Sequence, residues 1–321
     1  MQPKRALITG VNGQDGIFLS ELLLKNGYVV IGISSQEKPN NSLNSDVVYV
    51  HSDIRDTKKV IEICDQLEVN ELYNLAAVSS VSQSFDEPLL TEEVNFQAPA
   101  KILEDFFRDT KVSEKRKFFQ ASSSEMFGLT ATEPQNEEVP FNPVSPYAKW
   151  KTEMHYRCES MRTSGHFVAS AIMYNHESSF RPDSFLSKKV TKTAAQISLG
   201  LANELKLGNP HAERDWGFAG DHISAAWMMM TKEFPDYYVI ATGKYRSVMY
   251  MVEVAFRAAG ISGEILNYLK FDDSLLRPKE VNRLVGDSSK AYRELGWSSS
   301  TTFEQLIESM VSFEKSILEG L

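Results

Sequence analysis

The sequence predicts an α/β protein in which a doubly wound parallel sheet is followed by a smaller C-terminal lobe that binds substrate. Two observations predict the sheet. Short apolar strands alternate with helical patterns over residues 1–175, and a glycine-rich turn joins the first strand to the first helix. The strands are apolar along their whole length, which is typical of parallel strands that helices cover on both faces.

The elements are expected in a regular order along this first part. Apolar residues run together in six expected strands, at 5–9, 28–33, 47–50, 71–77, 117–121 and 167–173. The first helix carries apolar residues at helical spacing from Phe18 to Leu23 and ends at the stop pair Asn26-Gly27. Further helices are expected at 58–67, 89–108 and 146–163, and Pro146 suits the first turn of the last one.

After residue 175 the pattern loosens, because glycine, proline and charged residues interrupt the apolar periodicity. We therefore expect residues 1–175 to form a first domain, which a segment at about 221–242 rejoins. Residues 176–220 and 244–321 are expected to form the smaller substrate lobe.

Composition excludes several classes of protein. The 321 residues carry 43 acidic and 34 basic side chains, a net charge of −9 that argues against a nucleic-acid-binding surface. The sequence has no run of about 18 apolar residues, so no membrane span is expected, and the cytoplasm is the expected location. Cys64 and Cys158 are expected as buried free thiols. No His/Cys cluster has the spacing of metal ligands, so no metal is expected.

A phosphate-binding turn is expected at 9–16, Thr-Gly-Val-Asn-Gly-Gln-Asp-Gly, between the first strand and the first helix. Its glycines allow a pyrophosphate to approach the backbone, and the helix N-terminus offers free N–H groups. This pattern indicates a Rossmann-type sheet that binds a dinucleotide. The expected contacts in the turn are Gly10, Asn12, Gly13, Gln14, Asp15 and Gly16. Those near the ends of the neighbouring strands are Ser34, Ser35, Asp53, Ile54, Leu75, Ala76 and Ala77.

The form of the dinucleotide stays open at this point. An acidic residue that ends the second strand would bind the ribose diol of NAD, and an arginine there would bind the 2′-phosphate of NADP. The sequence has Ser34, Ser35 and then Gln36-Glu37-Lys38 instead, which suits a phosphate or a solvated loop. Asp53 has two interpretations, a contact to the adenine edge or a residue of a helix N-cap region.

A catalytic group is expected around the fifth strand and the helix at 146–163. Tyr147 and Lys151 are four residues apart, so they share one helix face, and the lysine charge favours the phenolate form of the tyrosine. Ser123, at the end of the strand, is placed to hold the oxygen that Tyr147 deprotonates. Glu125, two residues later, adds a carboxylate, which suggests removal of a further proton and of water.

Several motifs resemble one known family, the GDP-mannose 4,6-dehydratases, which are extended short-chain dehydrogenase/reductases. The motifs occur in the family's order over residues 6 to about 310: Thr9–Gly16, Gln120–Glu125, Ser145–Tyr147, Asn175–Ser178, Arg214–Gly217, Arg277–Val281, Asp287–Lys290 and Leu295–Trp297. The resemblance implies oxidation of a hexose at C4, with Tyr147 as base and Ser123 assisting. It then implies that Glu125 removes the C5 proton and assists loss of the C6 hydroxyl, and that hydride returns to C6.

The resemblance also implies ligands and partners. It implies NADP as cofactor, with NAD as the alternative, and a GDP-sugar substrate held by the smaller, nucleotide-sugar-binding lobe. A homodimer built on a helix bundle is implied, with a homotetramer as the larger alternative. The implied substrate contacts are Ser80, Ser124, Asn175, Lys189, Arg214, Arg277 and Glu280.

The sequence departs from the family's pattern in three places. Ser34-Ser35-Gln36 replaces a double arginine, Lys149 and Trp150 stand inside the Tyr-x-x-x-Lys motif, and Pro182-Asp183-Ser184 replaces Arg-Gly-x-Asn. The last departure leaves a GDP-linked relative of mannose, such as a heptose, as an alternative substrate. A reductase or epimerase on the same scaffold and a non-catalytic dinucleotide sensor are the alternative functions; Glu125 argues against the first, and the Tyr147–Lys151 pair against the second.

Overall fold

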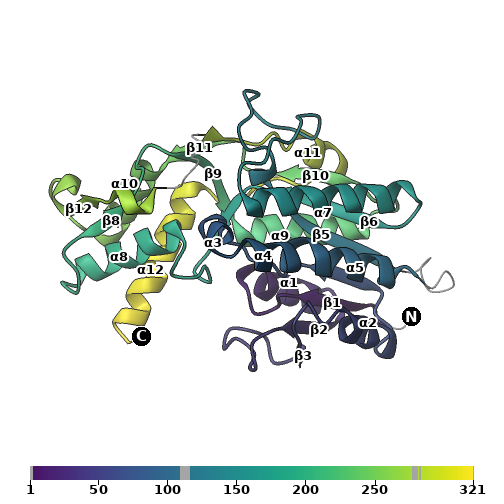
Figure 1. Ribbon diagram of the computed structural model, residues 1–321. Coiled ribbons are helices and arrows are strands. Elements are labelled where there is room, and N and C mark those ends of the chain that lie inside the picture. The colour runs from purple at the N-terminus through teal and green to yellow at the C-terminus, as the bar shows by residue number, and fades with distance from the viewer. Residues whose placement is uncertain (1–2, 109–115, 277–280, 282, 321) are drawn as a thin grey trace.

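The computed structural model describes residues 3–108, 116–276, 281 and 283–320. Within them, seven parallel strands form one sheet in the order β10-β6-β5-β4-β1-β2-β3 (Figure 1). The strands are β1 (Arg5–Thr9), β2 (Val29–Ser34), β3 (Val48–His51), β4 (Glu71–Asn74), β5 (Lys117–Ser123), β6 (Val168–Met173) and β10 (Tyr237–Ile240). This order reverses direction between β1 and β4, which is the point where doubly wound sheets bind dinucleotides.

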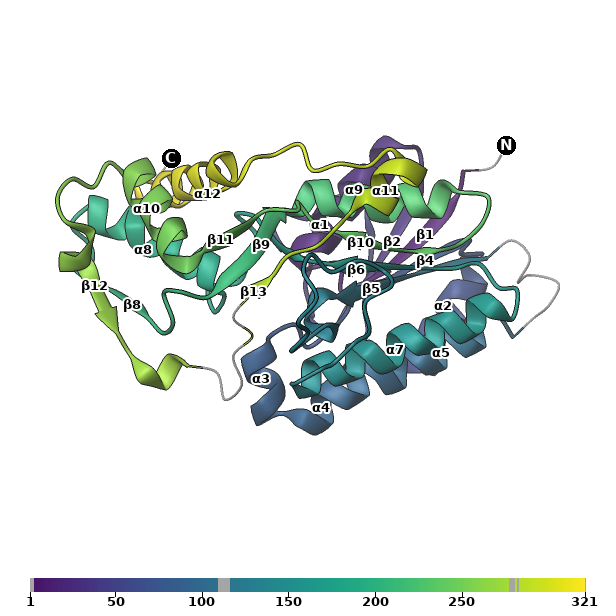
Figure 2. The same cartoon turned by 90° about the horizontal axis from the view of Figure 1, so that it is seen from above.

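Helices cover both faces of the sheet, as Figure 2 shows. One face carries α2 (Thr57–Gln66), α5 (Ala98–Phe106) and α7 (Pro146–Thr163). The other carries α1 (Gln14–Lys25), α9 (Ala219–Thr231) and α11 (Ser289–Leu295). This confirms the expected fold class.

Alternation along the strands explains why they are apolar throughout. Ala6 and Ile8 point into the core beneath α1 and α9, whereas Leu7 points into the core beneath α2 and α5. All three side chains are fully buried. Because successive side chains enter two different cores, apolar residues are favoured at both kinds of position along such a strand.

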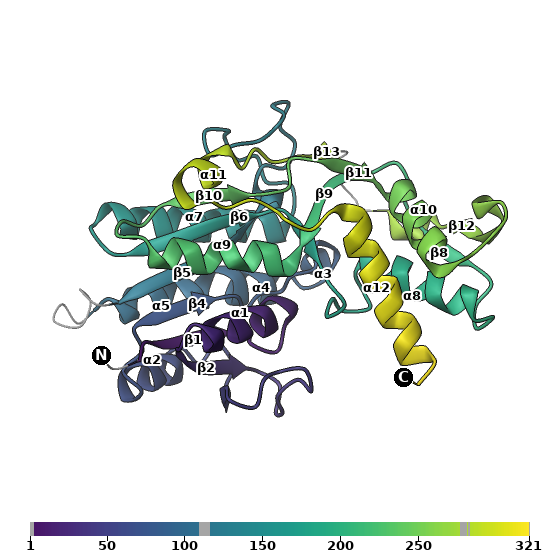
Figure 3. The ribbon, with the colours of Figure 1, turned by 180° about the vertical axis from the view of Figure 1, so that it is seen from behind.

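A second lobe extends away from the sheet (Figure 3). Helices α8 (Leu186–Ser198), α10 (Val248–Ala259) and α12 (Phe303–Leu318) pack on one another around a separate apolar core. Strand β9 (Glu213–Phe218) pairs with β7 (Asn175–Glu177), β11 (Tyr245–Ser247) and β13 (Arg283–Leu284), and β8 (Leu205–Leu207) pairs with β12 (Leu269–Phe271). The remaining short helices are α3 (Val81–Asp86), α4 (Pro88–Glu92), η1 (Glu93–Gln97), η2 (Ser124–Met126), η3 (Ile265–Tyr268) and η4 (Asp273–Leu275).

The element boundaries differ from the expected ones in a few places. β4 ends at Asn74 rather than at residue 77, because the next two backbone N–H groups, of Leu75 and Ala76, donate to the Thr9 hydroxyl instead of a neighbouring strand. The helical stretch expected at 89–108 consists of α4, the π-helical turn η1 and α5. Within the described residues, no helix has the length and apolar character that crossing a membrane requires.

Part of the C-terminal range 244–321, which we expected in the second lobe, packs on the large sheet instead. β10 pairs with β6 in the large sheet, and α11, which falls in the range 244–321, also packs against β10 and α9. α11 thus lies against the large sheet, although its residues fall in a range that we expected in the second lobe. Ala291 and Trp297 are buried in the core between the sheet and α9, and the Trp297 indole donates to the Asp221 carbonyl. Burial of these apolar side chains therefore holds this segment against the sheet. The domain boundaries themselves stay a prediction.

Candidate active site

A cavity of about 370 Å³ lies where the carboxyl ends of the central strands meet the second lobe. Among the expected site residues, the cavity is lined by Asp15, Leu75, Ala77, Ser80, Ser123, Ser124, Glu125, Tyr147, Lys151, Asn175, Lys189 and Arg214. Side chains that come from residues 15 to 214 of the sequence thus meet in one place. Arg277 and Glu280 lie outside the described residues.

The glycine turn is built for close backbone approach. Gly10 has φ +73°, and a Cβ atom there would lie 2.9 Å from the Ala76 backbone. A Cβ atom at Gly16 would lie 2.5 Å from the Cα atom and carbonyl oxygen of Val11. No side chain caps the N-terminus of α1 at Gly13, so its first N–H groups are available to an anion. The turn therefore fits a dinucleotide pyrophosphate.

Asn12 binds the loop after β2 rather than standing free for a ligand. Its amide group donates to the Gln36 side chain at 2.8 Å and to the Lys38 carbonyl at 2.9 Å, and its Oδ1 accepts from the Asn40 N–H at 3.0 Å. Asn12 therefore sets the position of this loop relative to the glycine turn. Ser34 is buried and accepts from the Gln36 N–H, whereas Ser35 is exposed.

Asp53 is held by its neighbour Arg55, whose backbone N–H donates at 2.8 Å and whose guanidinium donates to both carboxylate oxygens. The helix cap is Asp56, which accepts from the Lys59 N–H. Asp53 thus belongs to the turn before α2 and does not cap the helix. Its contact to adenine, like that of Ile54 beside it, stays a prediction.

Tyr147 and Lys151 start α7 together. Pro146 is the first residue of the helix, and the Ser145 hydroxyl caps it by accepting from the Ala148 N–H at 3.1 Å. The Lys151 Nζ atom lies 5.8 Å from the centre of the Tyr147 ring and donates to the Ala121 carbonyl at 2.9 Å. Helical spacing therefore places the pair on one face, directed at the end of β5.

Burial dominates the protonation of this pair. It raises the pKa of Tyr147 to about 12, an effect that a hydrogen bond from Ser123 opposes and the Glu125 carboxylate reinforces. Burial lowers the pKa of Lys151 to about 8, and the negative charge of Asp15 limits the fall. The lysine alone therefore does not lower the pKa of the phenol below its ordinary value. A further positive charge, such as that of an oxidised nicotinamide, would lower both pKa values.

Ser123 and Glu125 meet Tyr147 from the end of β5. Ser123 is the residue that caps the short helix η2, and its hydroxyl accepts from the Glu125 N–H at 3.2 Å. The same hydroxyl hydrogen-bonds the Tyr147 phenol, and the Glu125 carboxylate is near enough to act on the phenol's pKa. A hydroxyl, a phenol, an ammonium and a carboxylate thus surround one space, which is the set that proton removal at two neighbouring carbons needs.

The Arg-Asp-Trp-Gly motif alternates across β9. Arg214 and Trp216 face the cavity. Asp215 faces the other way, where its carboxylate accepts from the N–H groups of Thr242 and Gly243 and from the Thr242 hydroxyl. Gly217 has no room for a side chain, because a Cβ atom would lie 2.3 Å from the His222 ring. The motif therefore holds one cation in the cavity and ties β9 to the loop after β10.

The Asn-His-Glu-Ser motif forms β7 and a wall of the same cavity. Asn175 is the register partner of Trp216 and lines the cavity. Glu177 is buried, accepts from the Ser187 hydroxyl at 2.6 Å and forms an ion pair with Arg181 at 2.9 Å. Arg181, also in the lining, is thereby held toward the cavity.

The structure adds lining residues that the sequence left unassigned. They are mainly polar or basic and include Ser184, Lys206, Gly208 and Asn209. Burial lowers the pKa of Lys189, and the Asp272 carboxylate opposes this effect. The positive charge of Lys206 is close enough to lower the pKa of Lys189 further. Lys206 is the middle residue of the three-residue strand β8, and Asn209 follows that strand in a segment of irregular pattern, so no periodicity singled them out.

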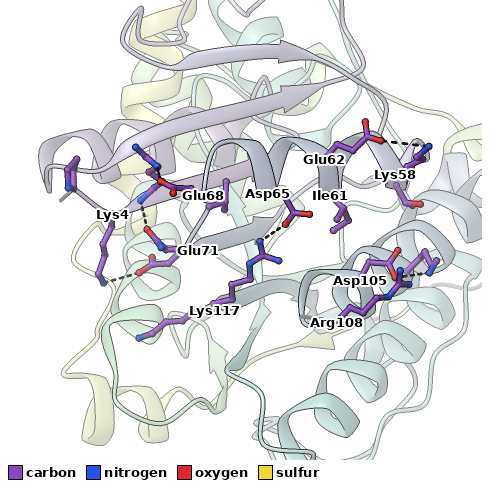
Figure 4. Close-up of a pocket in the computed structure, with 17 residues that line it drawn as sticks. Lys4, Lys58, Ile61, Glu62, Asp65, Glu68, Glu71, Asp105, Arg108 and Lys117 are labelled. Carbon is purple, nitrogen blue, oxygen red and sulfur yellow. Dashed lines mark hydrogen bonds and ion pairs between the residues drawn. The ribbon is translucent and has the colours of Figure 1, made fainter. Parts of the chain in front are cut away.

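A second hollow lies at the opposite, amino-terminal edge of the sheet (Figure 4). Its charged side chains pair with one another, as in Lys4 with Glu71 and Arg116 with Asp65. These pairings account for the charges there without a ligand.

Comparison with known proteins agrees with the geometry. Residues 7–310 match the model of a family described as GDP-mannose 4,6 dehydratase. GDP-mannose 4,6 dehydratase 2 of Arabidopsis thaliana is 38% identical, with 97% of this chain and 87% of the relative covered. GDP-mannose 4,6-dehydratase of Yersinia enterocolitica is 35% identical, with 96% and 93% covered.

Solved structures resemble the fold. UDP-glucose 4-epimerase of Thermotoga maritima with UDP-glucose superposes with a TM-score of 0.88 at 21% identity, covering 98% of this chain and 99% of the other. dTDP-glucose 4,6-dehydratase of Bacillus anthracis in complex with NAD gives 0.83 at 20% identity, covering 98% of each chain. The sequence match over nearly the whole length confirms the resemblance, and the chain belongs to the GDP-mannose 4,6-dehydratase family.

Proposed function

We propose that the protein is a lyase that converts GDP-mannose to its 4-keto-6-deoxy derivative with loss of one water molecule. The observation that carries the proposal is the meeting of Glu125 with Ser123, Tyr147 and Lys151 in one cavity, in a chain of this family. A bound nicotinamide dinucleotide supplies the hydride acceptor at C4 and the hydride donor at C6.

The protein's own groups move the protons. Tyr147 takes the proton of the C4 hydroxyl, which Ser123 holds by a hydrogen bond, while Lys151 adds positive charge beside the phenol. The resulting keto group makes the C5 proton acidic. Glu125 takes that proton and gives a proton to the C6 hydroxyl, which leaves as water. The proton that Tyr147 took from the C4 hydroxyl returns to C5 as C6 is reduced, so the net change is the loss of one water.

The basic groups of the second lobe hold the nucleotide in this proposal. Arg214 and Lys189 bind the diphosphate, since arginine suits bidentate phosphate contacts and lysine acts as a point charge. Ser80, Ser124 and Asn175 line the same cavity as the catalytic group, and we propose that they contact the sugar. Arg277 and Glu280 are proposed for the ribose from the family resemblance alone.

We propose NADP as the cofactor, with NAD as the alternative. β2 ends at Ser34, and Ser35 and Lys38 follow it. The first carboxylate beyond the strand is at Glu37, so the residue that ends β2 is not an acid that would hold a ribose diol. Purified protein should retain NADP, identified by mass, and NADP should raise the melting temperature more than an equal concentration of NAD. A larger shift with NAD would reverse the assignment.

The function is tested by incubating the protein with NADP and GDP-mannose and measuring the mass of the product. A product lighter by one water is expected. A C4 epimer of unchanged mass would instead indicate an epimerase, and binding without turnover of any GDP-sugar a non-catalytic protein. If a GDP-heptose turns over faster than GDP-mannose, Ser184 and its neighbours are the first place to seek the reason.

Glu125→Gln tests the carboxylate. Dehydration should fall by about 10²- to 10⁴-fold, the range for loss of a general acid/base, while cofactor binding is unchanged. Glu138→Gln, an exposed carboxylate that does not line the cavity, is the matched control and should keep the wild-type rate. Unchanged dehydration in Glu125→Gln would contradict the proposed role.

A further inference from the structure

An ion pair joins the cofactor turn to the substrate lobe. The Asp15 Oδ2 atom lies 3.0 Å from the His176 Nε2 atom. The other ring nitrogen of His176, Nδ1, lies 2.6 Å from the Tyr174 carbonyl oxygen, which only accepts, so Nδ1 carries a proton. Nε2 faces a carboxylate and carries a proton as well. His176 is therefore an imidazolium paired with an aspartate.

Gln14 locks the same two segments together. Its amide group donates to the Asp15 carboxylate at 3.1 Å and to the His176 carbonyl at 3.0 Å, and its Oε1 accepts from the Ser178 hydroxyl at 2.8 Å. The first turn of α1, which the cofactor's pyrophosphate would contact, is thus fastened to β7. β7 in turn pairs with β9, which carries Arg214.

Charged and titratable groups surround the pair from each neighbouring element. Arg181, after β7, acts on both partners, and Tyr147 and Lys151 of α7 feel the charge of Asp15. His222 of α9 stacks on His176 with ring centres 5.0 Å apart. Burial lowers the pKa of His222 to about 3, so the stacked ring is neutral and adds no competing charge.

We propose that Asp15 and His176 are positioning residues, whose ion pair fixes the distance between the cofactor turn and the substrate lobe. The proposal rests on the proposed function. The reaction uses that distance twice, because hydride leaves C4 and must return to C6 of the same bound sugar. Small misplacements of reacting groups cost about 10²-fold in rate. Loss of this ion pair, which we call the clamp, should therefore impair hydride return. Reduced cofactor that cannot give its hydride back would then remain stranded on the enzyme.

The test compares His176→Asn, Asp15→Asn and the double variant with wild type. We expect kcat to fall about tenfold or more in His176→Asn, with KM changed less than threefold, and reduced nicotinamide to accumulate in the steady state, seen by its absorbance. The kcat of the double variant should be no lower than that of the more impaired single variant, because the two residues act as one unit. His166→Asn, a ring packed on Phe107 far from the cavity, is the control.

The double variant separates positioning from simple electrostatics. His176→Asn leaves the Asp15 carboxylate unpaired, which should move the rate–pH profile to higher pH because that charge raises the pKa of Tyr147 and Lys151. The double variant removes both charges and should restore the profile. Stranded cofactor should nonetheless persist in it. If the stranded fraction returns to the wild-type level, the pair acts by charge and the proposal is overturned.

The remaining outcomes are also decisive. Variants that only melt earlier, with wild-type kcat and no stranded cofactor, would show a merely structural pair and overturn the proposal. If wild type does not turn over GDP-mannose, the proposed function fails separately. The affinity for GDP is then measured with and without NADP. A fivefold or larger enhancement by NADP, lost in His176→Asn, would support the clamp, and equal enhancement in both proteins would refute it.

Discussion

Tyr147 illustrates how a residue's chemistry depends on more than its motif. The Tyr-x-x-x-Lys spacing places an ammonium on the correct helix face, yet burial raises the pKa of the phenol to about 12. The Lys151 ammonium donates a hydrogen bond to the Ala121 carbonyl. If Tyr147 is the base, as we propose, the positive charge of an oxidised nicotinamide would lower the pKa of the phenol, so that deprotonation of the sugar would depend on the bound cofactor.

Lys206 provides a test of the nucleotide site at the scale of one residue. Lys206→Met should raise KM for GDP-mannose about two- to fivefold, since a partly exposed ion contact contributes ~1 kcal/mol at most, and should leave kcat unchanged. Lys270→Met is the control, because Lys270 is the register partner of Lys206 on β12 but does not line the cavity. Equal effects of the two changes would indicate general electrostatics rather than contact.

The charge of His176 predicts a pH-dependent stability. Burial lowers the pKa of His176, but Asp15 more than offsets this and raises it above 6.5. A raised histidine pKa stabilises the fold fully below about pH 6.5 and less as pH rises through the raised value. Asp15 has a lowered pKa, so its contribution is lost only in strong acid. The difference in melting temperature between wild type and His176→Asn should be largest near pH 5–6 and shrink above it. A difference that is constant with pH would mean a neutral ring.

At the scale of elements, Asp215 joins β9 to the loop after β10 and to the segment after β13. Its buried carboxylate accepts from Thr242, Gly243 and, at 3.4 Å, Gly286. Asp215→Ala leaves these donors without an acceptor and should lower the free energy of unfolding by on the order of 3 kcal/mol, measured by urea denaturation. Asp273→Asn, on an exposed short helix, should change it by less than about 0.5 kcal/mol. A small effect of Asp215→Ala would mean that water replaces the carboxylate.

The glycine turn is the second element with a sharp expectation. Gly16→Ala would bring a Cβ atom to 2.5 Å from the Val11 backbone, so α1 must move away from the turn. We expect weaker binding of NADP, by about tenfold or more, with the GDP site less affected, as calorimetry with each ligand would show. Unchanged cofactor affinity would mean that the pyrophosphate does not lie on this helix.

At the scale of the whole molecule, we propose a homodimer through the helices on the α7 face, as the family resemblance implies. Leu89 on α4 is 75% exposed, and α4 packs against α7. Leu89→Asp should convert the dimer to a monomer in light scattering after gel filtration. Leu201→Asp, an exposed leucine after α8, is the control and should stay dimeric. A wild-type tetramer would require a second interface, and a monomeric wild type would contradict the proposed dimer.

The sequence predicted most of the sheet because strand and helix patterns are local. The helix expected at 146–163 is α7 without change, and the first strand is β1 with the same bounds. The departures Lys149 and Trp150 lie outside the cavity, where Lys149 contacts the Trp150 ring and Trp150 stacks on Phe96. The place of α11 could not be predicted, because its burial depends on α9 and β10, which are distant in sequence.

By itself, the sequence determined the positions of most strands of the large sheet along the chain, the glycine turn and the shared face of Tyr147 and Lys151, since each follows from spacing of a few residues. Only the tertiary structure decided that Asp15 meets His176, 161 residues away, and that Lys206 reaches the cavity. Such contacts depend on how the second lobe closes on the sheet. That closure is set by burial of several apolar cores together, which no local pattern records.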